Sequence, residues 1–142
     1  MRMSRAAAYA VGSVLQLAEA PQGVPVPCSR LAKVGEMPER FLLQVLRNLV
    51  NHGVLHSTRG VEGGYSLSRP LDEITLLHIF EATDGPLVPS IPPLDSLPQE
   101  SKAKLERLLG KVTTELCQSL SGVSMADLLS AKESSPAHSS GT

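Results

Sequence analysis

Four polar residues in residues 38–52 have the chemistry to recognise nucleic acid. Arg40, Gln44, Arg47 and Asn51 fall on one side of a helix, opposite an apolar row formed by Leu42, Val45, Leu46 and Leu49. Arginine can bind guanine, glutamine or asparagine can bind adenine, and each can bind phosphate. The pattern predicts a helix that enters the major groove of DNA. The alternative is the ordinary polar face of a surface helix.

A glycine-rich segment next to this helix could contact a second groove. Residues 54–58 and 65–68 are short β-prone runs around Arg59-Gly60-Val61-Glu62-Gly63-Gly64, which indicates a hairpin. The glycines, Gly60 among them, allow close approach to a phosphate backbone, and an arginine such as Arg59 can read a narrow minor groove. The alternative is a plain turn with an exposed arginine. A nucleotide-binding loop is excluded, because the segment joins strand to strand and no Gly-Lys-Ser or Gly-Lys-Thr follows.

The charge of the chain supports this interpretation only when it is resolved by position. The whole chain has a net charge of -1, which argues against a nucleic-acid binder. Residues 1–70, however, hold eight basic and four acidic residues, a net charge of +4, whereas residues 71–142 hold five and ten, a net charge of -5. This asymmetry predicts a polyanionic partner for the first half.

Other kinds of site have little support. Cys28 and Cys117 cannot form a disulfide framework and indicate a reducing cytoplasm. We expect each to be a small buried residue, with a thiol redox switch as the alternative. His52, His56 and His78 lack the spacing of a metal site and are expected at the surface or facing phosphate.

The remaining function classes are excluded by what the chain lacks. No catalytic triad or paired carboxylates are apparent, so we expect no enzyme. No apolar run reaches the ~18 residues of a membrane span, and polar residues interrupt the N-terminal segment, so no signal peptide is predicted.

The elements that must position these residues follow from periodicity. Helices are predicted over residues 4–20, with Ser4 as N-cap, over 28–36, with Gly35 near the end, and from Pro38 to about His52. The predicted inward residues of the first helix are Ala7, Val11, Val14 and Ala18, with Ala10 and Leu17 beside them. Those of the second helix are Leu31, Ala32 and Val34. After the hairpin, Thr75 caps a fourth helix that ends at Asp84-Gly85. The fold class is mainly α with a small β-hairpin wing, a winged helix-turn-helix domain over residues 1–85.

The second half predicts a different unit. Residues 86–98 contain five prolines and form a loop. Residues 99–131 hold a long helix, predicted over residues 99–121, followed by a short one behind a capping box at Ser124 and Asp127. Residues 132–142 are predicted to be disordered. The long helix carries one apolar stripe, which we expect to be a dimerisation surface: Leu105, Leu108, Leu109, Val112, Leu116 and Leu120.

Several segments together resemble the Rrf2 family of bacterial transcription regulators. They are the start Met-Arg-Met-Ser-Arg with Tyr9-Ala10-Val11, the run Phe41-Leu42-Leu43-Gln44-Val45-Leu46, the wing Arg59-Gly60-Val61-Glu62-Gly63-Gly64-Tyr65, and Glu81-Ala82-Thr83-Asp84-Gly85-Pro86-Leu87. The resemblance covers residues 1–87 and resumes at residues 124–129. It implies a homodimer joined by the long helix, base-reading residues at Arg40, Phe41 and Gln44, and a wing arginine at Arg59; Phe41 could equally be core.

One departure from the family matters for cofactors. Members that bind an iron–sulfur cluster carry three cysteines in the loop between the fourth helix and the dimer helix. Residues 87–98 contain none, so we expect no cluster and no other cofactor.

The predicted function is therefore a cytoplasmic, homodimeric regulator of transcription that binds double-stranded DNA, most simply as a repressor. Two alternatives stay open. One is a winged-helix module that binds a protein instead of DNA. The other is a thiol-sensing or small-molecule-sensing regulator built on the same dimer, whose effector the sequence does not identify.

Overall fold

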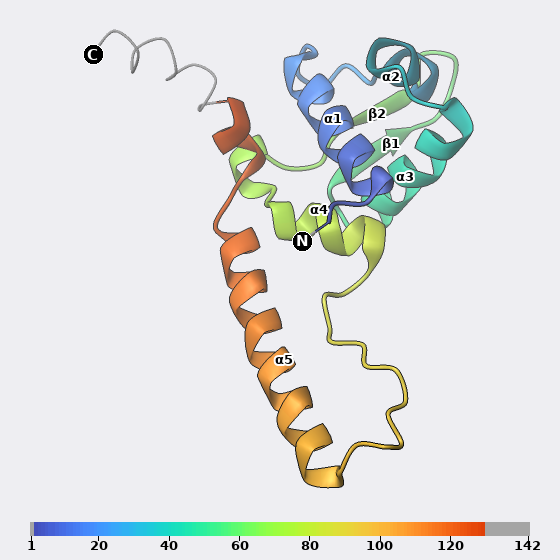
Figure 1. Ribbon diagram of the computed structural model, residues 1–142. Helices are drawn as coiled ribbons and strands as arrows, with labels where there is room; N and C mark the ends of the chain where they lie inside the picture. The colour runs from blue at the N-terminus through green and yellow to red at the C-terminus, as the bar shows by residue number, and fades with distance from the viewer. Residues whose placement is uncertain (1, 130–142) are drawn as a thin grey trace, which may run out of the picture.

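A two-stranded hairpin and four helices enclose one aliphatic core (Figure 1). The computed structural model describes residues 2–129. Its elements are α1 (Arg5–Glu19), α2 (Cys28–Gly35), α3 (Glu39–Asn51), β1 (Leu55–Thr58), β2 (Gly64–Leu67), a 3₁₀ turn (Leu71–Glu73), α4 (Leu76–Asp84), α5 (Gln99–Ser121) and a last short helix at 125–129. This order confirms the predicted winged helix-turn-helix class.

α1 runs through the centre of the head, the unit formed by residues 2–85 (Figure 1). The Ser4 hydroxyl caps the helix by accepting from the Ala7 N–H at 3.0 Å, and it donates to Asp84 at the end of α4 at 2.7 Å. The predicted inward face was partly wrong. The fully buried residues are Ala7, Ala10, Ser13, Val14 and Leu17, whereas Val11 and Ala18 are only half-buried, because α2, α3 and α4 pack around one side.

A tight turn joins α2 to α3. Glu36 takes the left-handed conformation there, with φ of 53°, although the sequence favoured Gly35 for that role. A β-carbon at Gly35 would meet only the movable ends of the Met37 and Gln16 side chains, so the packing does not demand a glycine there. Val34 was also predicted inward and is 64% exposed. Pro38 is the N-cap of α3 rather than its first helical residue.

The core face of α3 was predicted correctly. Its four buried residues are Leu42, Val45, Leu46 and Leu49. The helix packs against α1, α2, α4 and β1. This apolar row fixes the rotation of α3 and so decides which of its side chains face outward.

α4 connects the head to the end of α5. Its capping box pairs the Thr75 hydroxyl with the His78 N–H at 3.2 Å and the His78 ring nitrogen Nδ1 with the Thr75 N–H at 3.0 Å. His78 is therefore a half-buried capping residue and not the surface residue that the sequence suggested. Just beyond α5, the chain returns to the head, where the Met125 N–H donates to the Ile74 carbonyl at 2.7 Å.

α5 projects from the head as an arm (Figure 1). Its bounds match the prediction, and the loop at 86–98 lacks regular structure apart from a turn. The Ser124–Asp127 capping box is confirmed, with hydrogen bonds of 2.8 and 3.2 Å. Among the described residues, no helix has the length and apolarity to cross a membrane. The predicted disorder of 132–142 concerns residues outside the described range.

The capping role of His78 makes a prediction about stability. Burial lowers the pKa of His78 below its ordinary value of 6.5, and the charge of Arg69 acts in the same direction, although Glu81 opposes it. The folded imidazole therefore stays neutral at pH values where the unfolded chain already binds a proton. Stability must fall as pH drops below about 6.5 and level off once the folded-state pKa is passed.

We expect His78→Gln to lose less stability than the wild type between pH 7.5 and pH 5.5, because glutamine keeps an acceptor for the Thr75 N–H and does not titrate. Urea denaturation at both pH values measures this difference. Equal losses in the two proteins would contradict the role assigned to His78.

Candidate nucleic-acid interface

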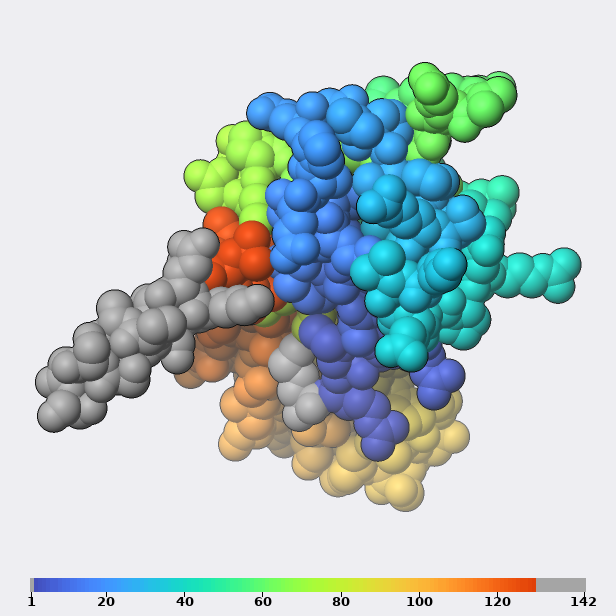
Figure 2. Space-filling model, turned by 90° about the horizontal axis from the view of Figure 1, so that it is seen from above, coloured from blue at the N-terminus to red at the C-terminus, as the bar shows by residue number. Residues whose placement is uncertain are grey.

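The polar row of α3 lies on the outside of the head. Arg40, Gln44, Arg47 and Asn51 are all exposed, opposite the buried leucine and valine row. α3 lies on the side of the head away from α5 in both views (Figures 1 and 2). These side chains are therefore free to reach a groove of DNA without displacing any described element.

The side chain of Gln44 is held by Asn48, a residue that the sequence did not single out. Its amide nitrogen donates to the side-chain oxygen of Asn48, one turn later, at 3.4 Å. Asn48 is half-buried, and its backbone carbonyl lies 2.9 Å from Nδ1 of His52. The Gln44–Asn48 pair leaves the Gln44 side-chain oxygen available to accept a hydrogen bond from a base.

Phe41 has an intermediate position between core and surface. Its ring is 43% exposed and meets the Tyr9 ring of α1 edge to face, with the centroids 5.5 Å apart and the planes at 87°. Such pairs hold aromatic rings in a fixed orientation. Phe41 thus presents an apolar edge beside Arg40 at the start of α3, and part of it packs on its own domain.

The hairpin places Arg59 at the base of an exposed tip. Leu55, His56, Ser57 and Thr58 of β1 pair with Leu67, Ser66, Tyr65 and Gly64 of β2 in antiparallel register. Arg59 follows β1 directly, Gly60 has φ of 111°, and Val61 at the tip is fully exposed. Seen from above, the hairpin projects on the same side of the head as α3 (Figure 2). One surface can therefore contact two adjacent grooves.

The glycines of the tip serve the hairpin itself. A β-carbon on Gly63 would overlap the Thr58 carbonyl oxygen, and one on Gly64 would overlap Val26. Val26 belongs to the segment before α2 and exchanges backbone hydrogen bonds of 2.9 and 2.8 Å with Tyr65. This bridge ties the hairpin to the helix-turn-helix. From the sequence, these glycines were expected to allow close approach to a phosphate backbone. The packing of the hairpin alone accounts for the need for glycine at positions 63 and 64.

The two cysteines lie on different elements. Cys28, at the start of α2, is half-buried, and its thiol donates to the Glu39 carbonyl at 3.8 Å. Burial raises the pKa of the Cys28 thiol, and the negative charge of Glu39 raises it further. Since the thiolate is the reactive form, this environment disfavours Cys28 as a redox switch. Cys117 is half-buried on α5.

The leucine stripe of α5 divides into two parts. Leu108, Leu109 and Val112 are exposed, with Val112 at 59%. Leu105 and Leu116 are half-buried. Leu120 is only 8% exposed and packs into the core of the head, so it is not part of the exposed face of the stripe. Three large apolar residues thus remain uncovered on the described arm.

The fold and this surface define a winged helix-turn-helix protein. Among family models, the chain matches the Rrf2 family, described as iron-dependent transcriptional regulators, over residues 3–131. The chain therefore belongs to the Rrf2 family, which confirms the resemblance seen in its motifs.

Two relatives illustrate the range of similarity. The chain is 44% identical over 87 residues to a Mycobacterium tuberculosis protein with the provisional name HTH-type transcriptional regulator Rv1287, covering 61% of this chain and 54% of that protein. It thus spans about half the length of this relative. It is 28% identical over 130 residues to the HTH-type transcriptional regulator CymR of Bacillus subtilis, covering 92% of this chain and 91% of that one.

Solved structures show the same fold. The structure of CymR, described as the global cysteine regulator of B. subtilis, matches with a TM-score of 0.70 at 24% identity, over 92% of this chain and 98% of that one. T. potens IscR matches with a TM-score of 0.67 at 25% identity, over 93% and 88%.

The role of Gly63 can be tested directly. We expect Gly63→Ala to destabilise the protein by ~1–3 kcal/mol, because the new β-carbon overlaps the Thr58 carbonyl. Gly12→Ala is the matched control, since nothing lies within 4 Å of its β-carbon position in α1 and a helix gains up to ~1 kcal/mol from this change. Urea denaturation measures both. A Gly63→Ala variant as stable as the wild type would refute the packing explanation.

Proposed function

We propose that this protein is a sequence-specific DNA-binding transcription regulator that acts as a homodimer. The observation that carries the proposal is the exposed row Arg40, Gln44, Arg47 and Asn51 on α3, with Arg59 on the same side of the head. α3 enters the major groove, Phe41 and Arg40 contact it near the start of the helix, and Arg59 with Gly60 follows the minor groove.

The charge distribution supports this docking. The net charge of +4 on residues 1–70 attracts the phosphate backbone, while the net charge of -5 on residues 71–142 keeps the rest of the chain away from it. Binding is then governed by release of counterions and weakens steeply with salt. The proposed action is repression by occupation of a promoter in the cytoplasm, and no catalytic step is involved.

The exposed part of the α5 stripe is the proposed dimer contact. Leu108, Leu109 and Val112 form a continuous apolar face on an arm that extends from the head (Figure 1). A patch of large apolar residues in this setting favours association, because burial removes it from water. Two heads joined in this way present two α3 helices for successive major grooves, about 34 Å apart.

The proposal includes no iron–sulfur cluster. Thiolates are the usual ligands of such clusters, and residues 87–98 contain no cysteine. Cys28 on α2 and Cys117 on α5 lie on other elements, outside the loop in which cluster-binding members carry their cysteines. The residues present therefore do not fit the cluster.

DNA recognition is tested at its two contact points. We expect Gln44→Ala and Arg59→Ala each to weaken binding to a selected DNA site by ~1–3 kcal/mol, about 5-fold to 150-fold. The site is obtained by selection from random DNA with the wild-type protein, and affinity is measured by fluorescence anisotropy at fixed salt. Arg107→Ala on α5 is the control and should bind normally. Wild-type affinity in both test variants would refute the assignment of the interface.

The dimer contact is tested on α5. We expect Val112→Glu to raise the dimer Kd by ~100-fold or more, because a buried carboxylate without a partner is costly. Ala103→Glu places the same charge on the opposite side of the helix and should leave the dimer intact. Sedimentation equilibrium gives both constants. A Val112→Glu protein that dimerises like the wild type would exclude this face.

A further inference from the structure

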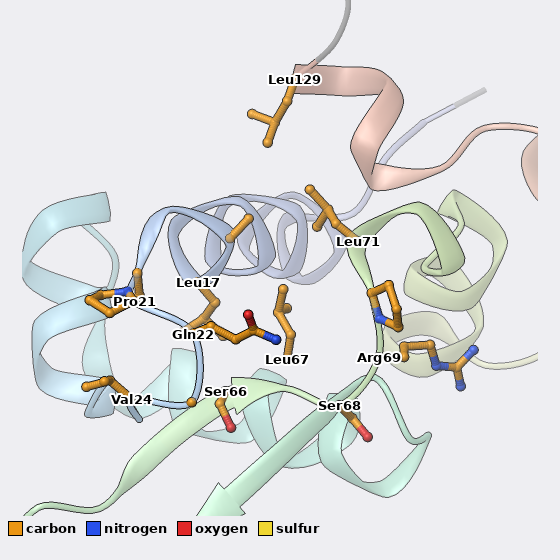
Figure 3. A pocket seen from close by; sticks show the side chains of 14 residues that line it. Leu17, Pro21, Gln22, Val24, Ser66, Leu67, Ser68, Arg69, Leu71 and Leu129 are labelled. Carbon is orange, nitrogen blue, oxygen red and sulfur yellow. The ribbon is translucent and has the colours of Figure 1, made fainter.

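A cavity of about 620 Å³ lies between the head and the short helix at 125–129 (Figure 3), and none of its described lining residues belongs to α3 or to the Pro-rich loop. Its walls come from the end of α1, the turn after it, the chain that leaves β2, and the short helix at 125–129. Leu17, Leu67, Leu71 and Leu129 surround it (Figure 3). Small-molecule sites in proteins have about this size and are lined mainly by apolar side chains.

The polarity of the walls restricts what can enter. Figure 3 shows the Gln22 side chain directed toward Leu67, whereas the hydroxyls of Ser66 and Ser68 turn away from the cavity. Among the described residues of the lining, Arg69 is the one that carries a charge, and its side chain also turns away, with Nε donating to the Gly53 carbonyl at 3.3 Å. A charged ligand would therefore find no charged partner among the described side chains that face the cavity.

The end of the described chain argues for a ligand from outside. Leu129 is both a wall of the cavity and the last described residue. The thirteen residues after it begin Ser-Ala-Lys-Glu-Ser-Ser-Pro and contain no large apolar side chain. They have nothing suited to the four leucines of the wall, so the chain's own continuation is a poor occupant.

We infer that this cavity binds a small, uncharged, mainly apolar molecule, with the Gln22 amide as its hydrogen-bonding partner. The site joins three functional parts: α1 of the core, the strand β2 of the hairpin, and the segment that follows α5. Binding there changes the position of the hairpin relative to the arm and so changes affinity for DNA. This second step rests on the proposed function, whereas ligand binding does not.

Two dyes with the same rings and different charge test the site on the full chain. We expect the neutral N-phenylnaphthylamine to bind saturably, one per chain, with enhanced fluorescence, and its sulfonated analogue anilinonaphthalenesulfonate to bind at least ~10-fold more weakly. In Ala18→Phe the new side chain fills the cavity from α1, so this variant should bind the neutral dye at least ~10-fold more weakly. Ala8→Phe, on the exposed side of α1, should bind it like the wild type. Circular dichroism and urea denaturation verify that both variants are folded.

Each outcome decides a separate claim. Absence of saturable binding, equal binding by Ala18→Phe, or tighter binding of the sulfonated dye would overturn the ligand site, whatever the protein does with DNA. Saturating neutral dye should change DNA affinity in the wild type and leave it unchanged in Ala18→Phe. An unchanged affinity in the wild type would refute the coupling. Because dye binding is measured without DNA, failure of the DNA proposal is seen independently.

Discussion

The packing of α3 against the core of the head is the contact on which the remaining structure depends. With few aromatic residues, the chain builds this core mainly from leucine, isoleucine, valine and alanine, with Phe80 and Met125 added, and the row Leu42, Val45, Leu46 and Leu49 is its contribution from α3. Burying this row against α1, α2, α4 and β1 leaves one rotation for the helix. The polar row is consequently presented outward, and β1, which packs on α3, brings the hairpin to the same side.

The extent to which the sequence predicts this structure differs by type of feature. Regular spacing predicted the core face of α3 and the length of α5, because periodicity reports burial directly. The same spacing gave partly wrong inward residues for α1, because alanines on several sides of that helix make its buried face ambiguous. It also wrongly predicted that Val34 points into the core. The left-handed residue at Glu36 and the backbone bridge between Val26 and Tyr65 depend on contacts that no local pattern records. The Gln44–Asn48 pair, in contrast, has the i, i+4 spacing of neighbours on one helix face and could have been found from the sequence. The cavity combines three separate segments of the chain and has no signature in the sequence.

Membership of the Rrf2 family restricts the function of this protein but does not identify the signal to which it responds. The chain shares the winged helix-turn-helix and the wing sequence of the Rrf2 family, yet lacks loop cysteines and buries the Cys28 thiol under conditions that raise its pKa. The feature that distinguishes this protein is therefore the way in which a signal would reach its DNA-binding surface. The apolar cavity next to the hairpin is the site through which we propose that a neutral molecule alters DNA binding.

The central claim is that two α3 helices read successive major grooves from one dimer. Methylation interference on the selected DNA site tests it most directly, because methylation of guanine N7 blocks contacts in the major groove. The account predicts two clusters of interfering guanines whose centres are about 10 base pairs, or 34 Å, apart and related by two-fold symmetry. A single cluster, or interference confined to the minor groove at adenine N3, would contradict it.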